Sequence, residues 1–170
     1  MLLTDPQLQC NSPTYNHFFS LAAHSTELHF ESAPDQLENV RSQVLPPPTD
    51  SRPGPAKLEP GDFFVTTHSN LGRAQVVFHM VGERQNVASS WTQLLAGLRN
   101  ILTVASHYDI ATLSLPILLV EPEFRHLYSD GQGIKRAEEV IRTIRGFLVL
   151  NAASGISLKT VRLVFPPQQN

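Results

Sequence analysis

The residues of this chain best suited to metal or redox chemistry are its histidines and one cysteine. The seven histidines are His17, His24, His29, His68, His79, His107 and His126. Metal sites usually place histidines at short fixed spacings, such as HxxxH, with a carboxylate nearby, and none of these histidines has that spacing. Cys10 is the single cysteine, so it has no disulfide partner within the chain. We therefore expect no metal centre and no disulfide, and the cysteine usage fits a reducing, intracellular compartment.

Two serines, Ser114 and Ser154, are candidate nucleophiles. The nucleophilic serine of many hydrolases lies in a GxSxG turn between a strand and a helix. Ser114 lies inside an apolar run without flanking glycines, and Ser154 follows two alanines. The sequence therefore supports no hydrolase chemistry.

A glycine pair, Gly131 and Gly133, precedes a predicted helix. Backbone N–H groups in such a loop can bind an anion, as in dinucleotide-binding proteins. The third glycine of that motif is absent, and the segment before it is too long for a tight turn between strand and helix. We interpret residues 130–133 as a flexible loop, with anion binding as the alternative.

The most apolar run, 111–120, ends without a glycine. Ligands of open α/β sheets lie beyond the carboxyl ends of the strands, where phosphates need small residues to reach backbone N–H groups. Here the sequence is Leu115, Pro116, Ile117, Leu118 and Leu119. The turn is therefore poorly suited to binding a phosphate.

Three further groups of polar residues are explained by the fold, without a ligand or a reaction. His79 lies in the middle of a predicted strand, which indicates a hydrogen-bonded histidine of the core or of a sheet face. Asp62 and the segment 68–70 are typical of turns stabilised by short polar side chains. Arg99 and Asn100 interrupt the apolar side of a helix, and we interpret them as a solvated face, with an interface contact as the alternative.

Composition indicates one folded domain. The chain has 170 residues, of which 41% are hydrophobic and 16% charged, a balance that argues against disorder. The net charge of −2 comes without a cluster of lysine and arginine, so nucleic acid is not an expected partner. No apolar run reaches the ~18 residues of a membrane span, and no secretory signal is visible. Because the chain ends directly after a strand-like run, we expect it to be part of a longer protein.

Proline divides the chain into three zones. Residues 1–44 are predicted to form a helix, a strand and a helix, over 13–23, 27–31 and 32–43. Residues 45–60 are rich in proline and form a linker or long loop, with an SH3-type PxxP ligand as the alternative reading. Residues 61–170 form the main α/β domain.

The main domain has the predicted order β-β-α-β-α-β. The expected elements are strands 61–67 and 74–81 joined by the turn 68–73, helix 91–105, strand 112–119, helix 134–148 and strand 158–165. Ser89 or Ser90 is the expected cap of the first of these helices, and Gly155 follows the second. Strands that alternate with helices predict a largely parallel sheet covered on both faces.

Two sets of residues carry a family resemblance. The segments 60–71 and 76–82, with the order of elements that follows, resemble the middle of a macro domain. More narrowly, the chain resembles the family of subunit 3 of the FERRY complex, an endosomal Rab effector assembly, in the C-terminal region of that family. The motifs that carry this second resemblance are Gly61–Phe64, His68–Leu71, Gly97–Leu102, Asp109–Ile110, Leu115–Val120 and Arg136–Glu138, with further similarity near 15–19 and 27–31.

The resemblance implies a macro-domain-like α/β fold, with a mixed, mostly parallel sheet flanked by helices, in partial or degenerate form. Macro domains hold the diphosphate of ADP-ribose between two glycine-rich loops. Here the proline-rich segment takes the first position, and Ile117–Leu119 take the second.

The resemblance further implies a non-catalytic scaffold without cofactors or site residues. The expected partners of this domain are other protein subunits of a multi-subunit complex. The expected location is cytoplasmic and peripheral to early endosomes. The expected role of the complex is in early-endosome trafficking and mRNA transport. Leu118, Leu119, Trp91 and Phe124 are the apolar residues expected to be only partly covered by the fold. The alternative is a divergent macro domain that binds ADP-ribose or a related nucleotide.

Overall fold

The computed structural model describes residues 1–25, 27–44, 58–82, 90–120 and 129–165. The elements are β1 (Leu2–Thr4), α1 (Pro13–Ala23), α2 (Ala33–Val44), β2 (Phe63–Leu71), β3 (Ala74–Val81), α3 (Trp91–His107), β4 (Thr112–Pro116), α4 (Asp130–Asn151) and β5 (Thr160–Val164). A 3₁₀ turn over Ala152–Ser154 follows α4. The predicted order β-β-α-β-α-β from residue 61 onward is confirmed.

The strands form two sheets, with the orders β1-β3-β2 and β4-β5. β1 pairs with β3 and β4 pairs with β5 in parallel, whereas β2 and β3 form an antiparallel hairpin. The Met1 ammonium donates to the Ser114 carbonyl at 2.8 Å and so joins the two sheets. The mixed, mostly parallel arrangement matches the predicted fold class.

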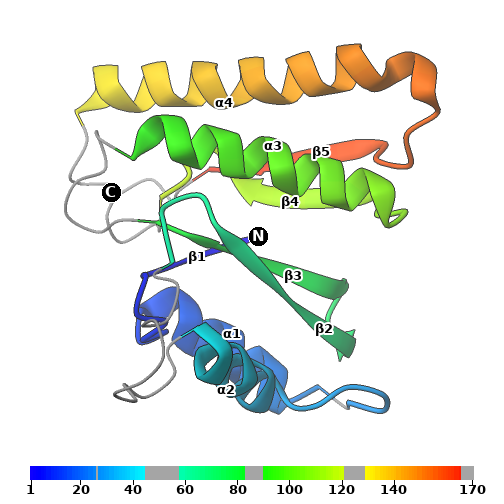
Figure 1. The fold of residues 1–170 in the computed structure, drawn as a ribbon. Helices are drawn as coiled ribbons and strands as arrows, with labels where there is room; N and C mark the ends of the chain where they lie inside the picture. The colour runs from blue at the N-terminus through cyan, green and yellow to red at the C-terminus, as the bar shows by residue number, and fades with distance from the viewer. Residues whose placement is uncertain (26, 45–57, 83–89, 121–128, 166–170) are drawn as a thin grey trace, which may run out of the picture.

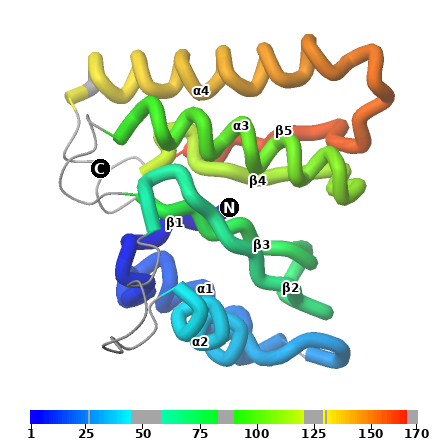
Figure 2. The backbone as a smooth tube through the Cα atoms, in the orientation of Figure 1, coloured from blue at the N-terminus to red at the C-terminus, as the bar shows by residue number. Residues whose placement is uncertain are grey.

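Helices cover both faces of the three-stranded sheet. Figure 1 shows α3 and α4 above the sheet β1-β3-β2 and α1 and α2 below it, and the backbone tube in Figure 2 shows the same layers. The first hydrophobic cluster packs α3 and α4 against Phe78, Met80 and Leu115. The second packs α1 and α2 against Leu71 and Val77. The fold therefore has one core on each side of β1-β3-β2.

The first forty-four residues belong to this architecture through β1 and α1. β1, which the sequence analysis missed because it is three residues long, extends the sheet next to β3. α1 begins as predicted: the Ser12 hydroxyl accepts the Tyr15 N–H at 3.3 Å, and Pro13 occupies the first turn. Its apolar side turns Tyr15 and Phe18 into the second core.

The strand predicted over 27–31 is wrong. Those residues form bends, and Leu28 and Phe30 are exposed. Their contact with β2 runs through side chains instead of a backbone ladder: the Leu28 and His29 N–H groups donate to Ser69 Oγ at 3.0 and 3.2 Å. Alternation of polar and apolar residues was therefore not enough to make a strand here, because a serine side chain satisfies the two backbone donors.

Three other boundaries also differ from the predictions. β2 continues through His68 to Leu71, so the hairpin turn is only Gly72 and Arg73, with a register shift between Thr67 and Leu71. The pair Gly131–Gly133 lies in the first turn of α4 and not in a loop, because Ser129 and Gln132 form a capping box that starts the helix earlier. β5 is shorter than predicted at both ends.

The start of α3 is held close to the β2 hairpin by two glycines. A Cβ on Gly97 would lie 2.3 Å from the Gly61 carbonyl oxygen, and Gly61 itself has φ +91°. The predicted cap Ser90 does occupy the N-cap position, but its side chain makes no capping hydrogen bond. Backbone proximity, and not capping, positions this helix.

Several predictions fall on residues that the structure does not describe. They are the proline-rich segment up to residue 57 with its PxxP alternative, Ser89, Phe124 and His126. Within the described ranges, no helix is long and apolar enough to cross a membrane.

Candidate functional site

The carboxyl end of β4 is closed by apolar side chains. The strand ends at Pro116, three residues earlier than predicted, because the chain turns back: Leu119 N–H donates to the Pro116 carbonyl at 3.2 Å and Leu119 has φ +47°. Ile117, Leu118 and Leu119 are 3%, 8% and 2% exposed. The place where a phosphate-binding loop would expose backbone N–H groups is thus a turn packed with aliphatic side chains.

Arg136, on α4, contacts both this turn and Trp91 on α3. Its guanidinium lies 4.2 Å from the centre of the Trp91 ring, and its Nη1 approaches the Leu118 carbonyl at 3.5 Å. The Trp91 indole N–H donates to Glu139 on α4. Arg136 is buried and stacks on an aromatic ring, a contact that favours a planar, delocalised cation. The motif residue Arg136 therefore has a structural role at the end of β4.

A chain of buried hydrogen bonds crosses the opposite core. Tyr15 Oη lies 2.7 Å from His79 Nδ1, and His79 Nε2 lies 2.9 Å from Thr66 Oγ1. Thr66 Oγ1 also lies 2.9 Å from His68 Nε2, whose Nδ1 is 3.0 Å from a Glu27 carboxylate oxygen. We call Tyr15, His79, Thr66, His68 and Glu27 the buried hydrogen-bond chain. It joins α1, β3, β2 and the segment after α1.

The protons of this chain have one consistent order when both rings are neutral. Glu27 only accepts, so His68 donates from Nδ1 and accepts the Thr66 hydroxyl proton at Nε2. Thr66 then accepts from His79 Nε2, and His79 Nδ1 accepts from Tyr15. Burial lowers the pKa of His79 to about 3, which keeps its ring neutral. The Ser69 N–H, 2.7 Å away, lowers the pKa of the Glu27 carboxyl.

The buried hydrogen-bond chain is a structural feature of the core. Thr66, His68, His79 and Tyr15 are each at most 1% exposed. The prediction that His79 is a hydrogen-bonded histidine of the core is confirmed. His68, which the sequence analysis placed in a turn, is a second one. Buried polar groups with complete partners of this kind fix the register of the elements that carry them.

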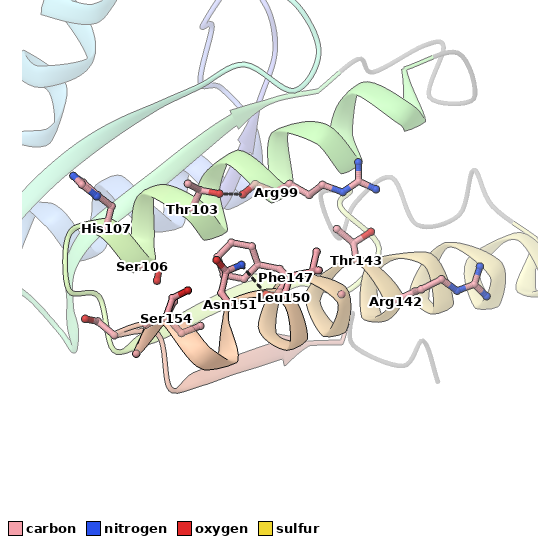
Figure 3. A pocket seen from close by; sticks show the side chains of 14 residues that line it. Arg99, Thr103, Ser106, His107, Arg142, Thr143, Phe147, Leu150, Asn151 and Ser154 are labelled. Carbon is pink, nitrogen blue, oxygen red and sulfur yellow. Dashed lines mark hydrogen bonds between the residues drawn. The ribbon is translucent and has the colours of Figure 1, made fainter.

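A polar groove of about 790 Å³ lies between α3 and α4. Its lining includes Arg99, Thr103 and His107 on α3, and Arg142 and Asn151 on α4, with no acidic residue. Figure 3 shows the two arginines toward one end of the groove and His107 with Ser154 toward the other. The two guanidinium groups therefore do not converge with His107 on one point, and the groove is an open cationic trough rather than an enclosed catalytic pocket.

A smaller, apolar groove of about 230 Å³ lies between α4 and β5. Its lining is Ile141, Ile144, Arg145, Leu148, Val149, Val161 and Leu163. Two of its lining side chains are exposed, Ile141 to 46% and Val149 to 66%. We call α4 with β5 and this groove the α4–β5 surface. It gathers much of the apolar surface that the described residues leave uncovered.

The apolar residues that are exposed in the structure are not the ones that the sequence predicts to be exposed. Leu118 and Leu119 are buried within the domain, which contradicts the expectation that they are only partly covered. Trp91 is partly buried under Arg136. Arg99 and Asn100 are exposed, in agreement with a solvated face. A sequence signal for the α4–β5 surface was available, since residues 140–170 contain four arginine or lysine residues and no acidic one.

The other candidate residues lie in separate places. Ser114 is exposed on β4, whereas Ser154, in the 3₁₀ turn after α4, lines the α3–α4 groove together with His107. Asp62 accepts the Glu59 N–H at 2.8 Å, as expected of a turn. In the part of the chain that the structure describes, no three His, Cys, Asp or Glu residues gather as they would around a metal ion.

Comparison with known proteins identifies a sequence family. The sequence model of one protein family matches residues 1–169, and that family is described as Fy-3, Ferry endosomal RAB5 effector complex subunit 3. The human protein of that name is 30% identical over 202 residues, which cover 98% of this chain and 35% of the relative. The proteins from Pongo abelii and Rattus norvegicus are 30% and 29% identical, with the same coverage. The chain therefore spans about a third of the length of these relatives.

Comparison of folds gives a macro domain. The crystal structure of the macro domain of ganglioside induced differentiation associated protein 2 aligns with a TM-score of 0.64 and 16% identity. The alignment covers 96% of this chain and 68% of the chain in that crystal structure. At this identity the likeness concerns the fold, and it confirms the macro-domain-like architecture.

Proposed function

This chain belongs to the family of Ferry endosomal RAB5 effector complex subunit 3, and from that premise we propose that it is a non-catalytic scaffold domain that binds other protein subunits of such a complex. The proposal includes an endosome-associated, cytoplasmic location and a role in early-endosome trafficking and mRNA transport. It assigns the domain no cofactor, no direct contact with nucleic acid and no insertion into the membrane.

The observation that carries the proposal is the α4–β5 surface. Folded domains rarely leave large aliphatic side chains clustered beside one another in water, and such clusters usually mark interfaces. Here Ile141 and Val149 are exposed in the lining of an apolar groove. A scaffold domain needs a surface of this kind more than it needs a ligand pocket.

The closed turn after β4 supports the same proposal. A ligand diphosphate at this place would have to displace Ile117, Leu118 and Leu119, which are buried, and the Arg136 contact that holds them. Removing a buried leucine from a packed core costs about 2–5 kcal/mol. Opening the turn for a ligand would therefore work against the stability of the domain.

The alternative function is binding of ADP-ribose or a related nucleotide, and the likeness to a macro domain favours it. Calorimetric titration of the chain with ADP-ribose separates the two proposals. We expect no heat of binding at micromolar ligand. Saturable heat with one site per chain would support the alternative.

Association with partner subunits tests the scaffold directly. The purified chain is mixed with each of the other purified subunits of the complex, and the mixtures are separated by size-exclusion chromatography with light scattering. We expect co-elution at a defined mass ratio with at least one subunit. Elution of the chain at its own mass in every mixture would contradict the proposal.

A further inference from the structure

We infer that the free edge of β5, together with the apolar groove beside it, takes an extended acidic segment of a partner protein as an additional β-strand. This inference rests on the proposed scaffold function and specifies how that function is carried out. Strand addition to an open sheet edge is a common way to bind a peptide, with backbone hydrogen bonds giving affinity and alternate side chains giving specificity.

Within the described residues, one side of the β5 backbone pairs with no other strand. In the parallel ladder with β4, Thr160 N–H donates to the Ala111 carbonyl at 3.0 Å and the Val164 carbonyl accepts Ile117 N–H at 3.0 Å. Residues of a parallel strand bond alternately to one side and the other. The backbone N–H and C=O groups of Thr160, Arg162 and Val164 therefore point toward β4. Those of Val161 and Leu163 point away from β4.

β5 is an edge strand in the described part of the chain, because β4-β5 forms a two-stranded sheet with β4 toward the rest of the fold. Natural proteins usually protect such an edge with proline, a bulge, a covering element or inward-pointing charges. The five residues of β5 are regular and contain no proline. Among the described residues no strand pairs with this edge, which is therefore suited to receive another strand.

Side chains next to the edge define what such a strand would carry. Val161 and Leu163 line the apolar groove with Ile141 and Leu148, so alternate residues of the added strand would be apolar. The residues between these apolar ones point to the other face of the added strand, where they would lie beside the exposed Arg162 of β5. The partner segment is therefore expected to alternate apolar and acidic residues.

Charge selects a partner over a second copy of this chain. Arg145 lines the groove, Arg162 is exposed on the other face of β5, and residues 140–170 contain no aspartate or glutamate. Among the described residues, Arg145 and Arg162 make no ion pair. Two copies joined along β5 would bring these cations together, whereas an acidic segment would neutralise them.

The first experiment measures peptide binding by fluorescence anisotropy. The probes are an octapeptide of alternating valine and glutamate and a matched octapeptide of valine and lysine. We expect the chain to bind the glutamate peptide several-fold more tightly, since its carboxylates lie on the face of Arg162, which attracts them and repels the lysines of the matched peptide. Equal binding of both peptides, or no binding of either, would overturn the inference.

Two variants with matched controls locate the site. The double variant Arg145→Glu, Arg162→Glu is expected to reverse the preference between the peptides, whereas Arg73→Glu, Arg99→Glu, which changes two exposed arginines elsewhere, keeps it. Val161→Pro removes an outward N–H without removing a bond to β4, and its control is Val161→Ala. Circular dichroism checks that each variant is folded. If Val161→Pro is unfolded, the charge variants decide the outcome alone.

The same variants, added to the subunit association assay, separate this inference from the proposed function. If the wild-type chain binds a subunit and the double variant loses that binding about tenfold or more, the inference is supported. If the double variant and wild type bind equally, the edge inference fails while the scaffold function stands. If the wild type binds no subunit, the scaffold function fails, and the inference fails with it.

Discussion

At the scale of single residues, the buried hydrogen-bond chain combines polarity with almost complete burial. Thr66 is its central member, since one hydroxyl serves both His68 and His79 at 2.9 Å. A hydroxyl that donates once and accepts once is the one small group that satisfies two neutral imidazoles in this order. The chain of bonds therefore depends on the chemistry of residue 66 and not on its size.

Thr66→Val tests this dependence. Valine has the same shape, but it leaves two buried imidazole nitrogens without partners, each of which costs about 1–3 kcal/mol. We expect the free energy of unfolding to fall by about 2–4 kcal/mol, measured by urea denaturation. The control is Thr103→Val, where the exposed hydroxyl donates to the Arg99 carbonyl within α3 and little change is expected. Equal effects of the two substitutions would contradict the account.

His79 also predicts a pH dependence. Its folded-state pKa of about 3 is below its ordinary value of 6.5, so the folded protein favours the neutral ring. This stabilisation is fully present above pH 6.5 and is lost as the pH falls toward 3, by up to about 1.4 kcal/mol per pH unit. The lowered pKa of Glu27 acts in the same direction below its ordinary 4.5.

The measurement is the free energy of unfolding between pH 7 and 5.5, above the range in which Glu27 titrates. We expect stability to fall with acidification in the wild-type chain and to fall less steeply in His79→Gln. The control variant His107→Gln makes the same replacement at an exposed position on α3. If His79→Gln retains the full slope, another group carries the pH dependence.

At the scale of elements, close backbone approach positions α3 on the hairpin. Glycine within a helix normally costs about 0.5–1 kcal/mol relative to alanine. At Gly97 the sign is expected to reverse, because a Cβ would lie 2.3 Å from the Gly61 oxygen and 2.8 Å from its Cα. Both contacts are with backbone, which cannot move aside without shifting the helix.

The matched pair is Gly97→Ala and Gly146→Ala. The first is expected to lower the melting temperature, with a loss of about 2–4 kcal/mol typical of overpacking against a rigid neighbour. The second lies on α4 with no atom within 4 Å of the added Cβ, so it should stabilise by about 0.5–1 kcal/mol. Stabilisation by both substitutions would show that α3 is free to shift.

Helices were predicted better than strands, for physical reasons. The apolar spacing and the Ser12 cap of α1 are local signals, and the helix begins where they predict. β1 has three residues and depends on β3 to form, so no local pattern announces it. The same limit applies to 27–31, where Ser69, forty residues away, replaces a ladder.

The candidate site was predictable only in part. The missing glycines after β4 predict a turn unsuited to phosphate, which stays a prediction, but they did not indicate that Leu118 and Leu119 would be buried against the core. The α4–β5 surface depends on two segments brought side by side, and periodicity within either one does not reveal it. The absence of acidic residues after position 139 was the one signal in the sequence.

At the scale of the whole molecule, the division of the chain at residues 45–60 stays a prediction. We propose that residues 1–44 are needed for folding, although composition sets them apart. They supply β1, and α1 and α2 cover the face of the sheet that carries Val77 and His79. A chain that starts at residue 58 would expose that face to water.

Deletion of residues 1–44 tests the proposal. We expect the shortened chain to lose cooperative thermal unfolding and to bind the dye ANS, as domains with an uncovered core do. The full chain is the reference in both measurements. A shortened chain that unfolds cooperatively, with little dye binding, would show that 45–170 is a domain in its own right.

The most direct test of the central claim is hydrogen–deuterium exchange of the chain alone and in the assembled complex. The account holds that this macro-like domain acts through protein contacts at the α4–β5 surface and not through a ligand beyond β4. It predicts slower exchange at Val161 and Leu163 on assembly, with unchanged exchange at Ile117–Leu119. Unchanged exchange along β5, with protection at the turn after β4 instead, would contradict it.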